Sequence, residues 1–307
     1  MSTEMSGLRE MSVEAESAAK GTVVVSVELP VTPARAWEAL TEPEVAAKWF
    51  GELTQGLRQG GASRLDFGDG DFFDIVDVKL APPQLIQYGW RFLGVGPLDT
   101  VTWRVAPADG GGCRVTVTDS EPFRSAEAAA MLREGWLDFT SRLVGFLVTG
   151  RPTRYDWRRE LDGIGEIPRA PSDARTLFED AGAQSAWLPF GGAALAEGAE
   201  FAPPDGLPPR TFAVRNLKRE GADSASFRVE CDGWLAPTEC ELELRPHGEG
   251  ALLSFSHTGW EAISRDPEEQ LTQRRRFCEL WVAALGRARQ VLESGAAGGG
   301  AFRARDA

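Results

Sequence analysis

The feature that most constrains this chain is that it repeats one order of sequence signals about 140 residues later. Pro107 and Pro246 are 139 residues apart, and Asp119 and His257 are 138 apart. In each copy a glycine-containing turn is followed by an alternating strand and then by a long amphipathic helix. Stacked short repeats have periods of about 20 to 50 residues, so this self-similarity predicts two whole domains.

A length of 307 residues fits two domains of about 150 residues each. Shifts in composition along the chain predict how it is organised. The segment from Leu161 to Ile167, within the predicted linker, also fits a poor first strand for the second copy. The predicted segments are a disordered N-terminus (1–19), a first domain (20–150), a linker (151–168), a second and degenerate copy (169–294) and a disordered tail (295–307).

The first copy has the pattern of an antiparallel meander that ends in a helix. Thr22 to Leu29 alternates apolar and polar residues, which is typical of a half-buried strand. Further strands separated by turn residues are expected over 63–67, 72–80, 85–92, 100–105 and 113–119. A helix of about 24 residues is expected between Ser125 and Gly150, and its apolar stripe must lie across the sheet. The second copy restarts near Ala174, and a long loop is expected from Gly191 to Pro209. The fold class is therefore α+β.

One face of the predicted sheet is rich in aromatic side chains. These alternate with outward residues and, together with the helix stripe, would line the space between sheet and helix. The candidate ligand-binding residues are Tyr88, Trp90, Trp103, Val117, Asp119, Trp136, Phe139 and Leu143. A filled hydrophobic core accounts for the same pattern.

Composition and spacing exclude several classes of function. A net charge of −13 disfavours nucleic-acid binding, which relies on clustered Lys and Arg. The four Cys and two His have no zinc or haem spacing, so neither a metal nor a cofactor is expected. The first twenty residues contain charged side chains and no apolar run, and no membrane-spanning stretch is visible. A cytoplasmic protein without membrane insertion is expected; the sequence does not indicate an oligomeric state.

The run from Thr32 through Trp49-Phe50, then Leu85 to Trp90 and Glu134-Gly135-Trp136, resembles the START-like (SRPBCC) helix-grip superfamily. Within it, the branch named after the activator of Hsp90 ATPase is the most similar, and Leu253 to Trp260 matches its strand-to-helix corner in the second copy. The resemblance implies two tandem helix-grip domains, each a curved antiparallel sheet wrapped around a long C-terminal helix, with a cavity for a hydrophobic ligand. The superfamily includes lipid carriers, hormone receptors and polyketide cyclases. It also includes the calicheamicin self-resistance protein, to which the chain has a distant similarity.

Two side chains are candidates for acid-base chemistry. Asp119 lies at the inward end of its strand, where burial would raise the pKa of a carboxyl, and His257 occupies the equivalent position in the second copy. Structural roles compete with both hypotheses: a strand-end carboxylate can cap a turn, and a lone histidine in an apolar strand is usually a satisfied core group. For the turn at Gly110, the positive φ of a hairpin is the ordinary explanation. A sacrificial hydrogen donor, as the resistance protein implies, is the alternative.

The sequence shows no Ser-His-Asp, Cys-His or phosphate-loop arrangement. This favours a non-catalytic binder of a bulky hydrophobic small molecule, such as a polyketide or enediyne-type metabolite, acting as a carrier, a sequestering protein or a self-resistance protein. A cyclase or hydrolase-type enzyme that uses the same cavity is the alternative. A chaperone-associated module is the third possibility.

Overall fold

The computed structural model describes residues 21–203 and 210–295. The chain divides into two compact units, here unit 1 (residues 1–157) and unit 2 (residues 158–307). The N-terminus and tail that were expected to be disordered fall outside the described residues, apart from the last residue of the final helix, Gly295.

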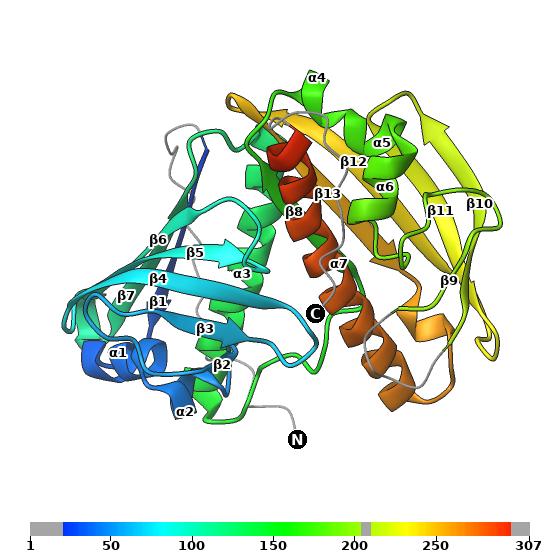
Figure 1. Cartoon of the computed structure of the whole chain (residues 1–307). Helices are drawn as coiled ribbons and strands as arrows, with labels where there is room; N and C mark the ends of the chain where they lie inside the picture. The colour runs from blue at the N-terminus through cyan, green and yellow to red at the C-terminus, as the bar shows by residue number, and fades with distance from the viewer. Residues whose placement is uncertain (1–20, 204–209, 296–307) are drawn as a thin grey trace, which may run out of the picture. The chain divides into compact units, whose positions relative to one another are not determined.

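Unit 1 is an antiparallel sheet with a long helix against it (Figure 1). In the described residues its seven strands follow the order β1-β7-β6-β5-β4-β3-β2. The strands are β1 (Thr22–Leu29), β2 (Glu52–Leu53), β3 (Ser63–Asp66), β4 (Phe72–Ala81), β5 (Leu85–Phe92), β6 (Asp99–Pro107) and β7 (Cys113–Ser120). The helices are α1 (Pro33–Thr41), α2 (Pro43–Ala46), the short η1 (Asp109–Gly111) and α3 (Ala126–Thr149).

Local sequence signals set the ends of α3. The Ser125 side chain accepts a hydrogen bond from the Ala128 N–H at 3.1 Å, which satisfies one of the free donors of the first turn. Gly150 ends the helix with φ at 68°, a left-handed conformation that glycine adopts without steric cost. The helix packs against β1, and its buried face carries Trp136, Leu143 and Phe146.

Unit 2 repeats this architecture in six described strands, ordered β8-β13-β12-β11-β10-β9. The strands are β8 (Leu161–Ile167), β9 (Glu200–Phe201), β10 (Phe212–Glu220), β11 (Ser224–Cys231), β12 (Thr238–His247) and β13 (Gly250–Thr258). The helices are α4 (Pro171–Ala174), α5 (Thr176–Glu179), α6 (Ala181–Trp187), η2 (Trp260–Ala262) and α7 (Pro267–Gly295). Figure 1 shows α7 lying along its curled sheet.

The fold class is therefore α+β, with two antiparallel sheets and a long C-terminal helix in each copy, as the sequence predicts. One boundary differs, because β8 lies inside the segment 151–168 that was expected to be a linker. The strand is regular because the buried positions Leu161, Gly163, Gly165 and Ile167 alternate with half-buried ones and the whole strand pairs with β13. The loop expected from Gly191 also contains ordered sequence, since β9 pairs with β10.

The duplication extends to individual atomic contacts. The indole N–H of Trp49 donates to the Ala39 carbonyl at 2.9 Å, and that of Trp187 donates to the Leu177 carbonyl at the same distance. A backbone bulge also recurs: Asp77 in β4 and Asn216 in β10 both have φ of 53°. Short Asx side chains tolerate this left-handed conformation better than most residues do.

Candidate functional site

The candidate binding residues of unit 1 converge between its sheet and α3. Tyr88, Trp90, Trp103, Val117 and Asp119 come from β5, β6 and β7, and all are at most 3 % exposed. Trp136 and Leu143 from α3 are equally buried, whereas Phe139 is half-buried.

These aromatic side chains pack against one another. The Trp136 ring stacks on Trp90 at 4.9 Å between centroids and meets the Trp103 ring edge-on at 5.3 Å. The Trp103 indole N–H donates to the Tyr88 hydroxyl oxygen at 3.0 Å, and burial raises the pKa of that phenol. In this conformation the aromatic face forms a packed core, and its contact with a ligand stays a prediction.

Further aromatic residues complete the cluster. Phe50 follows α2 and meets Phe139 edge-on at 4.8 Å, and Phe67 follows β3 and stacks on Phe139 at 5.8 Å. The strand alternation did not indicate these residues, because they lie in turns outside it. The Trp49-Phe50 pair within the family resemblance was the available signal.

Asp119 is the centre of a buried polar network. Its Oδ1 accepts from Arg124 Nη2 at 2.6 Å, and its Oδ2 accepts from the Trp136 indole N–H at 3.0 Å. The carboxyl is completely buried, and this desolvation raises its pKa, while Arg124 and the hydrogen bonds oppose the rise. The Trp90 N–H also favours the carboxylate, although that nitrogen reaches hydrogen-bonding geometry with no described atom.

Arg124 extends this network toward the surface. Its Nη2 also donates to Asp99 Oδ2 at 2.7 Å, and its Nη1 donates to the Gly21 carbonyl at 2.8 Å. The Asp99 side chain is 21 % exposed, so it connects the buried carboxylate with solvent. Burial, together with the neighbouring Asp119, raises the pKa of Asp99 to about 7.

Neither Asp99 nor Arg124 was selected from sequence, because each resembles an ordinary charge beside a turn. The duplication contained a signal for one of them. Asp99 and Thr238 are 139 residues apart, and both begin a strand that pairs with the strand carrying the polar residue, Asp119 or His257.

In unit 2 the equivalent site is sealed and neutral. The Trp281 indole N–H lies 3.1 Å from His257 Nδ1, which must therefore accept, so His257 Nε2 carries the proton and donates to Thr238 Oγ1 at 2.7 Å. His257 and Thr238 are both completely buried, and burial lowers the pKa of the imidazole well below its usual value. Both ring nitrogens are thus occupied.

The helix donor differs between the copies. The repeat offset aligns Trp136 with Phe277, but the indole that bonds to His257 belongs to Trp281, one turn further along α7. Phe277 instead meets the imidazole edge-on at 4.9 Å. The longer connection before α7 is already included in the alignment of Trp136 with Phe277, so the exchange reflects how α7 packs on its sheet.

Two carboxyls share one guanidinium in unit 1, so this site can hold or release a proton next to the aromatic cluster. Unit 2 presents an uncharged pair at the same place. In residues 21–203 and 210–295, no cluster of three or more His, Cys, Asp or Glu is arranged to hold a metal. Within the same part of the chain, every helix is too short or too polar to cross a bilayer.

Comparison with known proteins gives one family and several structures. The family described as activator of Hsp90 ATPase homolog 1-like protein matches residues 30–147. The crystal structure of DynU16, a protein in the dynemicin biosynthetic locus, is 36% identical with a TM-score of 0.80, and the match covers 89% of this chain and 100% of DynU16. No curated protein sequence matches significantly.

Two shorter structures also match. MLL2253 from Mesorhizobium loti is 22% identical with a TM-score of 0.37, covering 41% of this chain and 96% of its own. CalU16 from Micromonospora echinospora is 21% identical with a TM-score of 0.36, covering 46% of this chain and 87% of its own.

Proposed function

We propose that this chain, which belongs to the activator-of-Hsp90-ATPase-like branch of the START-like superfamily, binds a bulky hydrophobic small molecule in unit 1. It shares the tandem duplication of this fold with DynU16. The observation that carries the proposal is the 36% identity, over 89% of the chain, to a protein of the dynemicin biosynthetic locus. A polyketide or enediyne-type metabolite is the ligand class we propose, with a role in transport, sequestration or self-resistance.

The interior of unit 1 supports this proposal. Large aromatic rings offer apolar area and stacking surfaces to a polycyclic ligand. The buried Trp90 N–H favours the Asp119 carboxylate but reaches hydrogen-bonding geometry with no atom of the described residues, and a ligand carbonyl or phenol oxygen would give it a full acceptor. Phe139 is half-buried and lies on α3 in contact with Trp136 and Phe50, so it is the side chain we expect to move when a ligand enters.

Native mass spectrometry and tryptophan fluorescence test the proposal with a panel of aromatic polyketides and enediyne-type compounds. We expect a 1:1 complex, with affinity changed about tenfold or more by Phe139→Ala. Phe123→Ala is the matched control, because Phe123 is 59% exposed and the substitution should leave binding unchanged. If no compound binds, or if both variants bind alike, the proposed site is wrong.

A second candidate is a cyclase or hydrolase-type enzyme. The observation that favours it is Asp99, a partly exposed carboxyl whose pKa is raised to about 7, since a general base works best near that value. Turnover of a polyketide substrate should be lost in Asp99→Asn or Asp119→Asn without unfolding. We assign His257 a structural role, because both of its nitrogens are occupied.

The chaperone-associated role ranks third, since only the family description points to it. Co-purification with an Hsp90-type chaperone would support it.

A further inference from the structure

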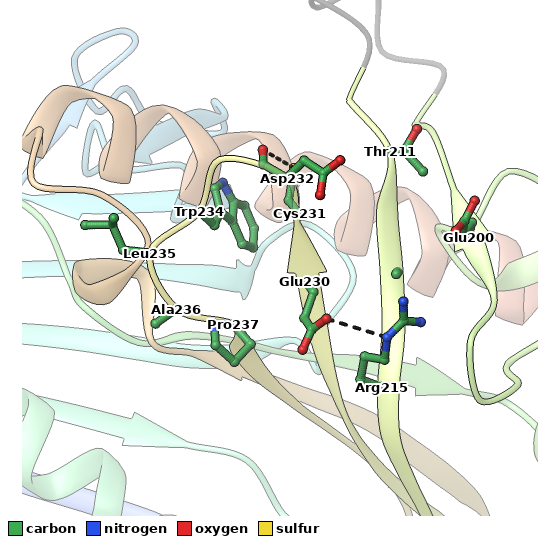
Figure 2. Close-up of a pocket in the computed structure, with 11 residues that line it drawn as sticks. Glu200, Thr211, Arg215, Glu230, Cys231, Asp232, Trp234, Leu235, Ala236 and Pro237 are labelled. Atoms are coloured by element: carbon green, nitrogen blue, oxygen red, sulfur yellow. Dashed lines mark hydrogen bonds and ion pairs between the residues drawn. The ribbon is translucent and has the colours of Figure 1, made fainter.

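Unit 2 has a pocket of about 330 Å³, which is lined by exposed and half-buried side chains on one face of β9, β10 and β11 and by the loop that follows β11. Figure 2 shows Glu200, Arg215 and Glu230 on three neighbouring strands, with the loop from Trp234 to Pro237 along the other side. Ala213 lies between these charged residues and contributes almost no side-chain volume. A pocket of this size is at the lower end of the range for small-molecule sites, which suits one or two fused rings.

The same face is filled in unit 1. There, Arg64 of β3 pairs with Asp74 of β4 at 2.8 Å, and the Arg64 guanidinium lies 3.9 Å over the Phe72 ring. At the repeat offset of 139, Asp74 corresponds to Ala213 and Phe72 to Thr211. The second copy therefore replaces a paired carboxylate and a large ring with two small side chains, which opens the pocket.

The neighbours of Ala213 have changed charge as well. In register, Asp74 lies between Arg64 and Arg91, whereas Ala213 lies between Glu200 and Glu230. Where unit 1 has a row of cation, anion and cation, unit 2 has one carboxylate on each side of an alanine. An occupant that completes this row carries a positive charge.

The balance of charge along the pocket points the same way. Its acidic side chains are Glu200, Glu230 and Asp232, and its basic side chain is Arg215. Arg210 also interacts with the Cys231 thiol, but it is already paired with Glu269 at 2.9 Å. Arg215 lies 3.5 Å from Glu230, so it satisfies one carboxylate at most. Beside Ala213, this leaves the Glu200 carboxylate without a basic side chain opposite it among the residues that line the pocket.

The opposite wall is apolar and held in place. Leu235 is 66% exposed, yet its N–H donates to the Ile263 carbonyl at 2.8 Å, so this exposed side chain is carried on a fixed backbone. Trp234 packs edge-on against Phe212 at 5.5 Å, and Pro237 continues the wall. An exposed leucine whose backbone is held in place offers an apolar contact surface for a ring beside the pocket.

We propose that this pocket binds a small organic cation, in which a protonated amine sits over Ala213 against the Glu200 carboxylate while its apolar ring lies against Leu235 and Pro237. The site uses residues of unit 2 alone. The proposal for this pocket is therefore tested independently of ligand binding in the interior of unit 1.

Cys231 provides a reporter for the test. Cys231 is one of the residues that line the pocket and is half-buried, whereas Cys113, Cys240 and Cys278 are buried. The full chain is treated with methyl methanethiosulfonate, which is neutral and thiol-specific, in the presence of 2-naphthylmethylammonium or the uncharged 2-naphthylmethanol. Mass spectrometry gives the rate at Cys231, and a Cys231→Ser variant shows that the signal comes from this thiol.

We expect the amine to slow the reaction at least fivefold with a Kd on the order of 1 mM, as the ligand efficiency of about twelve atoms allows. The alcohol should protect clearly less. Glu200→Gln should weaken binding of the amine roughly two- to fivefold, which is the usual contribution of one exposed charge pair. Ala213→Leu should abolish protection, because the larger side chain fills the site. Glu249→Gln, at an exposed carboxylate in the β12–β13 turn, is the matched control and should behave as wild type.

Equal protection by alcohol and amine would overturn the proposal, because it would show apolar adsorption without charge recognition. Undiminished protection in Ala213→Leu would also overturn it, since the ligand would then lie elsewhere. Circular dichroism of each variant checks that the fold is retained.

Discussion

The indole nitrogen of Trp136 lies 3.0 Å from Oδ2 of Asp119, which ties the long helix of unit 1 to the last strand of its sheet. The same carboxylate holds Arg124 at 2.6 Å. Removing it leaves a buried guanidinium with one carboxylate fewer and a buried indole N–H with no acceptor.

Asp119→Ala should therefore lower the free energy of unfolding of unit 1 by about 3–5 kcal/mol, the usual cost of breaking a buried ion pair. Urea unfolding followed by hydrogen-exchange mass spectrometry of unit 1 peptides measures this loss. Asp109→Ala is the control, because Asp109 is an exposed turn residue and its replacement should have little effect. Equal losses in the two variants would contradict the assigned role of Asp119.

The raised pKa of Asp99 predicts how the stability of unit 1 depends on pH. Between the unfolded value near 3.8 and about 7, the folded state keeps a proton that the unfolded chain releases. The free energy of unfolding should therefore fall as the pH rises through this window, by at most about 1.4 kcal/mol per pH unit for one proton. Asp99→Asn should flatten the dependence, and carboxyl 13C NMR should place the titration of Asp99 near pH 7. An unchanged slope in the variant would assign the dependence to other groups.

His257 predicts the opposite trend for unit 2. Burial lowers the pKa of His257, so below about pH 6.5 the unfolded chain takes up a proton that the folded state does not bind. The contribution of His257 to stability is present at higher pH and is lost as the pH falls below that value. Imidazole 15N NMR should show a neutral ring protonated at Nε2 throughout pH 5–8, and a titrating ring or a proton on Nδ1 would refute the hydrogen-bond assignment.

Two glycines at the sheet corners should be equally intolerant of a side chain. A Cβ added at Gly112 would lie 2.5 Å from the Leu29 carbonyl oxygen, and one at Gly250 would lie 2.5 Å from that of Ile167. Each Gly→Ala change should cost about 1–3 kcal/mol, because the clash is with backbone. Gly135→Ala, in α3 with open space around it, should instead stabilise by roughly 0.5–1 kcal/mol. Thermal unfolding of the three variants measures these changes in stability. An unchanged stability in Gly250→Ala would contradict the equivalence of the two corners.

The sequence predicted most of the fold because its signals are local and occur twice. Alternation in Thr22 to Leu29, the cap at Ser125 and the stop at Gly150 each depend on neighbours a few residues away. The strand β8 was the weak point: its glycines at 163 and 165 have low strand propensity, and only pairing with β13 stabilises them.

The candidate site was predicted less completely. The sequence pattern indicated Asp119, Trp136 and the aromatic residues of β5 and β6, and the fold brings them together. It did not indicate Asp99 and Arg124, because an ion pair between residues 25 positions apart leaves no periodic trace in a single sequence.

By itself the sequence determined that the chain makes two copies of one antiparallel sheet with a long helix, since periodicity, caps and turn glycines act over short distances. Only the tertiary structure decided that the aromatic side chains pack against one another. It also decided that Asp119 is paired with Arg124 and connected through it to the partly exposed Asp99, while His257 is neutral and buried. It also decided that Trp281 replaces Phe277 as the helix donor. Those outcomes depend on which distant side chains meet and on how much water they lose when they do.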